Sequence, residues 1–241
     1  MSFSPGRRLQ LISFALGVTL VLAVTPLGAQ ASVSNPTTKS VLSATLKAMG
    51  KVSGVHVYVK SKTGTSTSVV VVDIGATYGE ETITSGKNNV KIIVTPTDAY
   101  LSGSATGLTS IMGLTAAQQK KVGNLSIVMK AGSSPYTSFH SNLTTAVLAG
   151  ILPVAKGTKF KLGGGTNSKD YQLTWKKSAT STASATTSMM TISSGSKTLP
   201  IKEVITGSTG GGTTTFSKWG EHVVEQAPAT ANTITYAKVT A

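Results

Sequence analysis

Apolar and polar residues alternate along most of the chain after residue 53. Val55, Val57 and Val59 lie at alternate positions and the residues between them are polar or aromatic, which is typical of a half-buried antiparallel strand. Similar short runs, separated by Gly, Ser and Thr turns, predict further strands. The glycine-rich segment 207–212 is expected to be a flexible hairpin connection. The further runs lie at 69–74, 80–84, 90–94, 99–102, 125–129, 159–162, 171–175, 186–193, 198–206, 213–219 and 233–239.

Two stretches of the chain have helical spacing instead. Apolar positions recur along one stripe between residues 41 and 49, which predicts an amphipathic helix over residues 36–49 with Pro36 at its first position. A second stretch, residues 106–152, is expected to form a block of short helices with one strand inside it. Its helical spacing is carried by Leu108, Ile111 and Met112 and, with Asn142 as the expected cap, by Leu143, Val147 and Ile151.

A β chain with a central helical block can fold its sheet over the helices and enclose an apolar space between the two layers. Aromatic residues make up only 5% of the chain, so little bulk is available to fill such a space. The other apolar residues are mostly aliphatic, which suits an adaptable lining for an apolar ligand. An ordinary filled core is the competing interpretation. The candidate lining residues are Leu42, Leu46, Val55, Val57, Val59, Ile92, Leu108, Ile111, Met112, Val147, Leu148, Ile151, Leu173 and Met190.

The N-terminal segment has the pattern of an export signal. Arg7 and Arg8 precede a mostly apolar run, and Ala29-Gln30-Ala31 is the small-x-small motif that signal peptidase recognises. We therefore expect residues 1–31 to be a signal peptide and residues 32–241 to form a single domain. The apolar run is short for a membrane anchor. The loose twin-arginine match leaves open which export route is used, and the mature protein is expected to be secreted or in the cell envelope.

The net charge is +14, and lysine carries all of the positive side-chain charge after the N-terminal arginines. Proteins that read nucleic acids usually use arginine for bidentate contacts, so a nucleic-acid partner is not expected. Single lysines along strands indicate a solvated face. Such a face could also lie against an anionic membrane or cell-wall polymers. The chain has no cysteine, which excludes disulfides and the acylated cysteine of a bacterial lipoprotein.

No convergent catalytic set is recognisable in the sequence. The three histidines, His56, His140 and His222, are far apart and have no neighbours at metal-ligand spacing. Glu80 and Glu81 are adjacent, so on a strand they should point to opposite faces and not act as a pair. The glycine clusters lack the Lys-Ser/Thr ending of a phosphate-binding loop, and there is no Gly-x-Ser-x-Gly motif. A Ser-His-Asp arrangement stays open, because its members need not be near in sequence, but we expect a non-enzyme without metal or cofactor.

Several short stretches resemble one family of envelope proteins. They are Ser53-Gly54-Val55-His56 after the first helix, Asp98-Ala99-Tyr100-Leu101 before the helical block, and Lys218-Trp219-Gly220-Glu221 followed by Ala227-Pro228. In these stretches and in the order of its elements, the chain resembles the actinobacterial LppX/LprG family of cell-envelope lipid carriers. The resemblance implies a LolA-like α+β fold, in which a curved antiparallel sheet, or half-barrel, is closed by a block of short helices. It also implies that acylated lipids bind between sheet and helices, here without a lipobox cysteine.

Two functions from different classes are therefore expected to compete. The first is an exported carrier that binds a lipid or another apolar ligand, in which each buried CH₂ group contributes ~0.8 kcal/mol. The second is a non-catalytic structural or adhesive envelope protein, with a filled core and a lysine-rich face for anionic polymers. A monomer is expected in either case. A continuous apolar cavity between sheet and helices would favour the carrier.

Overall fold

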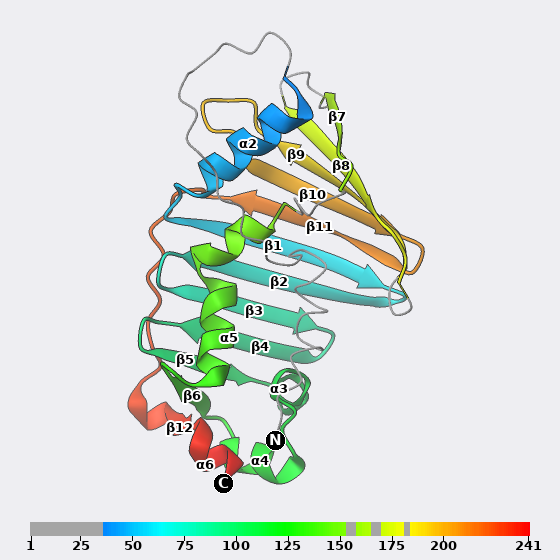
Figure 1. The fold of residues 1–241 in the computed structure, drawn as a ribbon. Coiled ribbons are helices and arrows are strands. Elements are labelled where there is room, and N and C mark those ends of the chain that lie inside the picture. The colour runs from blue at the N-terminus through cyan, green and yellow to red at the C-terminus, as the bar shows by residue number, and fades with distance from the viewer. Residues whose placement is uncertain (1–35, 153–157, 165–169, 181–183) are drawn as a thin grey trace.

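A single sheet connects nearly all of the strands that the sequence predicts. The computed structural model describes residues 36–152, 158–164, 170–180 and 184–241, so the expected signal peptide lies outside the described residues. Across these residues twelve strands lie in the order β12-β6-β5-β4-β3-β2-β1-β11-β10-β9-β8-β7 (Figure 1). Their bounds are β1 Gly54–Thr63, β2 Ser66–Gly75, β3 Gly79–Ser85, β4 Asn88–Val94, β5 Asp98–Gly103, β6 Ser126–Lys130, β7 Lys161–Gly164, β8 Tyr171–Lys177, β9 Thr186–Ile192, β10 Pro200–Gly207, β11 Gly210–Ser217 and β12 Thr233–Thr235.

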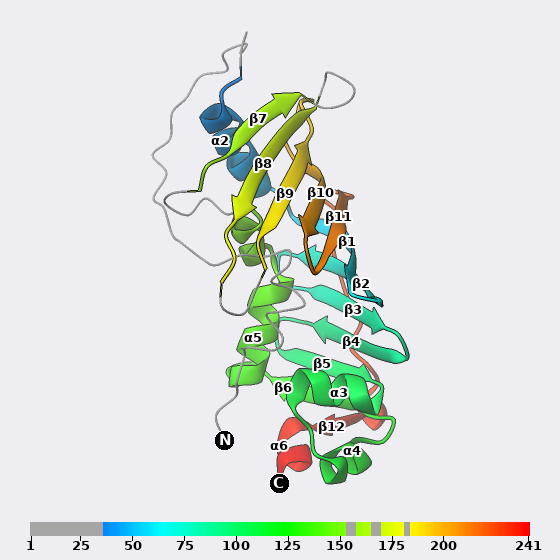
Figure 2. The same cartoon turned by 90° about the vertical axis from the view of Figure 1, so that its right-hand side faces the viewer.

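Neighbouring strands in this sheet run antiparallel, apart from β12, which is parallel to β6 at one edge. Since β12 and β7 are the two ends of the strand order, the sheet does not close into a barrel. Figure 2 shows that the sheet is curved, with helices on one side of it. The expected α+β fold with a curved, mostly antiparallel sheet is therefore confirmed.

Helices α2 and α5 lie on the same side of the sheet (Figures 1 and 2). We call this side the inner face; it carries Val55 and Val57 of β1, which pack with residues of α2. The opposite, outer face carries His56 and Tyr58. Among the described residues, no helix combines the length and apolar character needed to cross a bilayer. The helices are α2 Thr38–Met49, α3 Ala105–Met112, α4 Ala116–Val122, α5 Ser134–Leu143, α6 Tyr236–Thr240 and the 3-10 helices η1 Thr145–Gly150 and η2 Thr230–Asn232.

The end of the central helical block differs from the prediction. Asn142 does not cap a new helix; it lies in the last turn of α5, which ends one residue later. Thr144 is then extended, with φ −116° and ψ 165°, and forms an isolated bridge with Gly75 at the end of β2. A long-range contact with the sheet therefore breaks the continuous helix that the spacing predicted, and the chain continues as η1.

Three other local predictions are wrong in their bounds. Helix α2 begins after Thr37, whose hydroxyl accepts a hydrogen bond from the Ser40 backbone N–H, and not at Pro36. The predicted strand 233–239 is divided, because the hydroxyl of Thr235 caps helix α6 after only three strand residues. The glycines at 210–212 lie within β11 and pair with β1. They are therefore part of the sheet and not a flexible connection. Glycine suits these positions because a Cβ atom there would overlap the backbone of a neighbouring strand.

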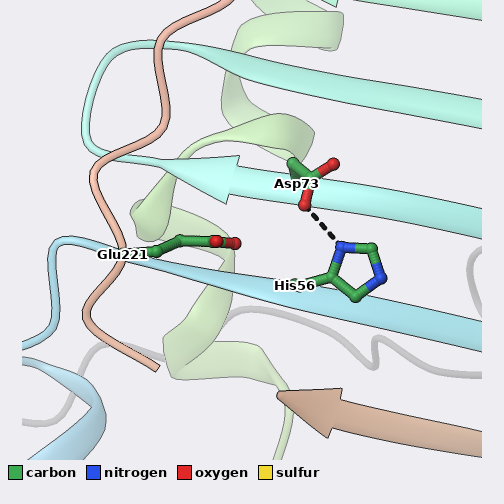
Figure 3. A group of neighbouring side chains, drawn as sticks. All are labelled: His56, Asp73 and Glu221. Carbon is green, nitrogen blue, oxygen red and sulfur yellow. Dashed lines mark hydrogen bonds and ion pairs between the residues drawn. The ribbon is translucent and has the colours of Figure 1, made fainter. Parts of the chain in front are cut away.

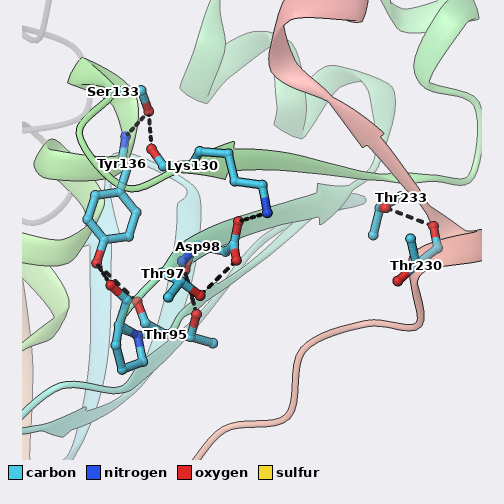
Figure 4. A network of polar contacts seen from close by, with 9 residues as sticks. Thr95, Thr97, Asp98, Lys130, Ser133, Tyr136, Thr230 and Thr233 are labelled. Atoms are coloured by element: carbon cyan, nitrogen blue, oxygen red, sulfur yellow. Dashed lines mark hydrogen bonds and ion pairs between the residues drawn. The ribbon is translucent and has the colours of Figure 1, made fainter.

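Helix α5 is fastened to the sheet at its first turn. The Tyr136 hydroxyl donates hydrogen bonds to the carbonyl oxygens of Thr95 (3.1 Å) and Pro96 (2.8 Å), in the turn between β4 and β5 (Figure 4). The same network contains an ion pair of 2.7 Å between Asp98 Oδ1 and Lys130 Nζ. Burial, with a smaller effect of Asp98, raises the pKa of the Tyr136 hydroxyl. The hydroxyl therefore remains protonated and keeps acting as a donor.

Replacing Tyr136 with Phe should lower the free energy of unfolding by about 1–2 kcal/mol, because two carbonyl groups lose their donor. Urea unfolding followed by circular dichroism measures the change. Tyr58→Phe is the matched control, since Tyr58 lies on the outer face and is 39% exposed. An equal effect of the two substitutions would contradict the anchoring role of Tyr136.

Candidate apolar ligand site

The inner face carries two apolar clusters and not one continuous group. The upper cluster lies where α2 and η1 meet β1 and β8–β11, at the top of Figure 1; the lower cluster lies where α3–α6 meet β2–β6. Of the predicted lining residues, the upper cluster contains Leu42, Leu46, Val55, Val57, Val147, Leu148, Ile151, Leu173 and Met190. The lower cluster contains Ile92, Leu108, Ile111 and Met112.

The two clusters meet at a boundary on β1 and β2. Val59 and Val72 pack against both clusters, and both are half-buried. They lie on neighbouring strands with the same inward parity, because Val57 pairs with Val72 and Val59 pairs with Val70. We call Val59 and Val72 the seam. The structure therefore brings all of the predicted lining residues to the inner side of the sheet, but divides them at this seam.

The predicted lining residues also differ in burial. Eight of them are buried in the two clusters, as ordinary core residues are. The other six are half-buried and keep part of their apolar surface accessible. They are Leu42, Leu46, Val59, Ile111, Met112 and Val147.

Glu203 of β10 introduces a carboxyl group on the inner face, where it is only 3% exposed. It lies between Met190 of β9 and Thr214 of β11 in the strand register. Desolvation by burial raises the pKa of this carboxyl to about 7, although a hydrogen bond with Ser188 acts in the opposite direction. Its Oε2 atom accepts no hydrogen bond from the residues that the structure describes. A titratable group is therefore held beside the upper cluster.

Glu81 of β3 is a second inward carboxyl, at 1% exposure, and it lies between Val72 and Ile92 in the register. Neither glutamate is among the predicted lining residues. The sequence could have placed Glu203 on the inner face, because it lies two positions from Ile205 on the same strand, and Ile205 is buried on that face. For Glu81 the sequence predicted only that it and Glu80 point to opposite faces, which the structure confirms.

Two hollows show how much free volume lies near these residues. A hollow of about 10 Å³ on the inner face is lined by Val59, Ser61, Ile205 and Thr214, and it has room for about one water molecule. A hollow of about 460 Å³ lies at the hairpin tips, lined by Lys62, Gly64 and residues 205–211. The larger hollow is remote from the helices and is lined mostly by glycine and polar residues. The hollow beside Val59 is too small to hold an acyl chain.

The lysines follow the solvated pattern that their spacing predicts. Every lysine among the described residues is exposed.

The chain was compared with known proteins. No protein-family model matches it, and no curated protein matches its sequence. Among solved structures it is similar to the lipoprotein LppX of Mycobacterium tuberculosis, with a TM-score of 0.48 and 16% identity over 77% of this chain and 96% of that one. It is also similar to LprF from Mycobacterium bovis, with a TM-score of 0.44 and 12% identity over 79% of this chain and 96% of that one.

Proposed function

We propose that this protein is an exported, non-catalytic carrier that binds a lipid or another apolar ligand between the sheet and its helices. Export depends on the signal peptide expected at residues 1–31, and the carrier is monomeric, acts outside the cytoplasm and binds no nucleic acid. Its ligand site is the seam, together with the half-buried residues of α2, α3 and η1. The resemblance of the sequence to envelope lipid carriers implies the same class of ligand.

The observation that carries this proposal is the half-buried apolar surface at the seam. Folding normally removes such side chains from water, yet Val59 and Val72 lie between two packed clusters without being fully covered. Covering them with an acyl chain would contribute ~25 cal/mol per Å² of buried apolar surface. The two clusters share only Val59 and Val72, so a shift of the helices over one cluster away from the other would open space for the ligand at the seam.

Substitution of Val147 by Lys should weaken binding of cis-parinaric acid, a fluorescent fatty acid, by roughly tenfold or more, because an ammonium group would replace apolar lining. Val147 is the suitable position, since it is half-buried in the upper cluster. Leu148 is only 1% exposed, and a charge there should unfold the protein. Fluorescence titration measures the affinity, and circular dichroism checks the fold.

Ala149→Lys is the matched control for this substitution, because Ala149 lies on the same short helix but is exposed. It should leave fatty-acid binding within about twofold of the unmodified protein. The carrier function is rejected if neither the unmodified protein nor its variants bind cis-parinaric acid, and if native mass spectrometry of the protein purified from its own host finds no bound lipid. The structural or adhesive function with a filled core would then take its place.

A further inference from the structure

The segment after β11 crosses the outer face of the sheet, on the side opposite the proposed ligand site. We call residues 218–229 the strap. It is held at Gly54, whose carbonyl accepts a hydrogen bond of 2.8 Å from the Gly220 N–H. A Cβ at Gly54 would overlap the carbonyl oxygen of Glu221, and one at Gly75 would overlap Val223. Glycine at these two positions therefore lets the strap lie directly on β1 and β2.

This crossing brings three side chains from distant parts of the chain together. Figure 3 shows His56 on β1, Asp73 on β2 and Glu221 on the strap. His56 Nδ1 is 2.6 Å from Asp73 Oδ1, and one ligand atom from each of the three residues lies within 4.8 Å of the others. The side chains of His56 and Asp73 are 24% and 30% exposed, so an ion from solvent can reach them.

One oxygen of Glu221 has no protein partner in this arrangement. Its Oε1 atom is shielded from solvent and accepts no hydrogen bond from any residue in the described part of the chain. The other oxygen, Oε2, is 3.9 Å from the Lys218 ammonium group. A buried carboxylate oxygen without a donor is costly, and a bound cation would satisfy it.

The surroundings of the three residues are acidic, in contrast to the basic chain as a whole. Desolvation and a hydrogen bond with Glu80 raise the pKa of Glu225 to about 7. Lys91 and Lys218 pair with two of the carboxyl groups, so four carboxylates and two ammonium groups leave a net charge of −2 when all are ionised. Half of the eight acidic residues of the chain lie here: Asp73, Glu80, Glu221 and Glu225.

We propose that His56, Asp73 and Glu221 form a binding site for a divalent transition-metal ion of the Zn²⁺ class. One imidazole nitrogen with carboxylate oxygens suits Zn²⁺, whereas Mg²⁺ and Ca²⁺ prefer oxygen ligands alone. Tetrahedral ligands at the usual Zn²⁺ distances are about 3.3 Å apart. Small side-chain rotations must therefore widen the His56–Asp73 contact and draw Glu221 in, and water supplies the fourth ligand. The ion would join β1, β2 and the strap.

Isothermal titration of the untagged protein with ZnCl₂ tests this site. We expect saturable binding of one ion per chain and a rise in the melting temperature, because the ion binds the folded state only. MgCl₂ at the same concentration should cause neither effect. His56→Gln, Asp73→Asn and Glu221→Gln should each weaken Zn²⁺ binding by at least tenfold.

His140→Gln is the control for non-specific histidine binding, because His140 lies on α5, on the other side of the sheet. It should leave Zn²⁺ affinity unchanged. Circular dichroism of each metal-free variant shows that it is folded, and Glu221→Gln preserves the size of the side chain. The site is rejected if Zn²⁺ does not saturate at one ion per chain, or if folded Glu221→Gln and His56→Gln variants bind Zn²⁺ as the unmodified protein does. Fatty-acid binding is a separate measurement and does not depend on this result.

Discussion

Replacing Gly79 with Ala should lower the free energy of unfolding by about 3 kcal/mol, the upper end of the usual cost of overpacking. A Cβ at Gly79 would overlap the carbonyl oxygen and Cβ of Leu143, where α5 ends against β3. Since the first obstacle is a backbone atom, it cannot rotate away, and α5 would have to move off the sheet. Urea unfolding and the shift in melting temperature measure the loss.

Gly163→Ala is the matched control for this substitution. Gly163 also lies in a strand, β7, but a Cβ there would have no atom of the described residues within 4 Å. Its replacement should change stability by less than about 0.5 kcal/mol. If Gly79→Ala were equally mild, the close approach of α5 to β3 would not be a determinant of stability, and the helix would be free to move at its C-terminal end.

Replacing Glu203 with Gln should stabilise the protein by up to about 3 kcal/mol above pH 8 and have little effect below pH 4.5. The carboxyl has a pKa of about 7 in the fold, against 4.5 in the unfolded chain, because burial disfavours its charge. In the unmodified protein the protonated form is compatible with the fold at low pH. Stability is then lost as the pH rises from about 4.5 towards 7, because the folded state binds the proton more tightly than the unfolded state.

Urea unfolding of both proteins at pH 4.5, 7 and 8.5 measures this dependence. Glu225 also has a raised pKa of about 7, but it is present in both proteins, so the difference between them isolates Glu203. A difference that stays constant across the three pH values would mean that Glu203 keeps its ordinary pKa. Circular dichroism at each pH ensures that only folded protein is compared.

The strands were predictable because alternation is a local property of the sequence. Val55, Val57 and Val59 mark β1 within five residues, and the structure extends that strand without changing its faces. The helix break at Thr144 was not predictable in the same way. It depends on a bridge to Gly75, and nothing in the residues around Thr144 indicates which distant strand it will contact.

The sequence predicted that the candidate lining residues are apolar and face the helices, but not how they are divided on the sheet. Hydrophobic spacing placed Leu108 and Leu148 on helices, but it could not show that they belong to different clusters. That division depends on which strands are neighbours in the sheet. The group of His56, Asp73 and Glu221 was hidden for the same reason, since only pairing of β1 with β2 and the path of the strap bring them together.

The pairing of β1 with β11 also constrains the order in which the sheet can form. Strands β1–β6 follow one another on one side and β11–β7 on the other, so each half can form by pairing strands that are neighbours in sequence. The halves join only when His56 comes to lie opposite Ser217. Until then β1 has a free edge that can pair with another chain, and joining across so long a separation is slow. Because synthesis begins at the N-terminus, β1 would be exposed before β11 is made, and aggregation would compete with folding at this stage.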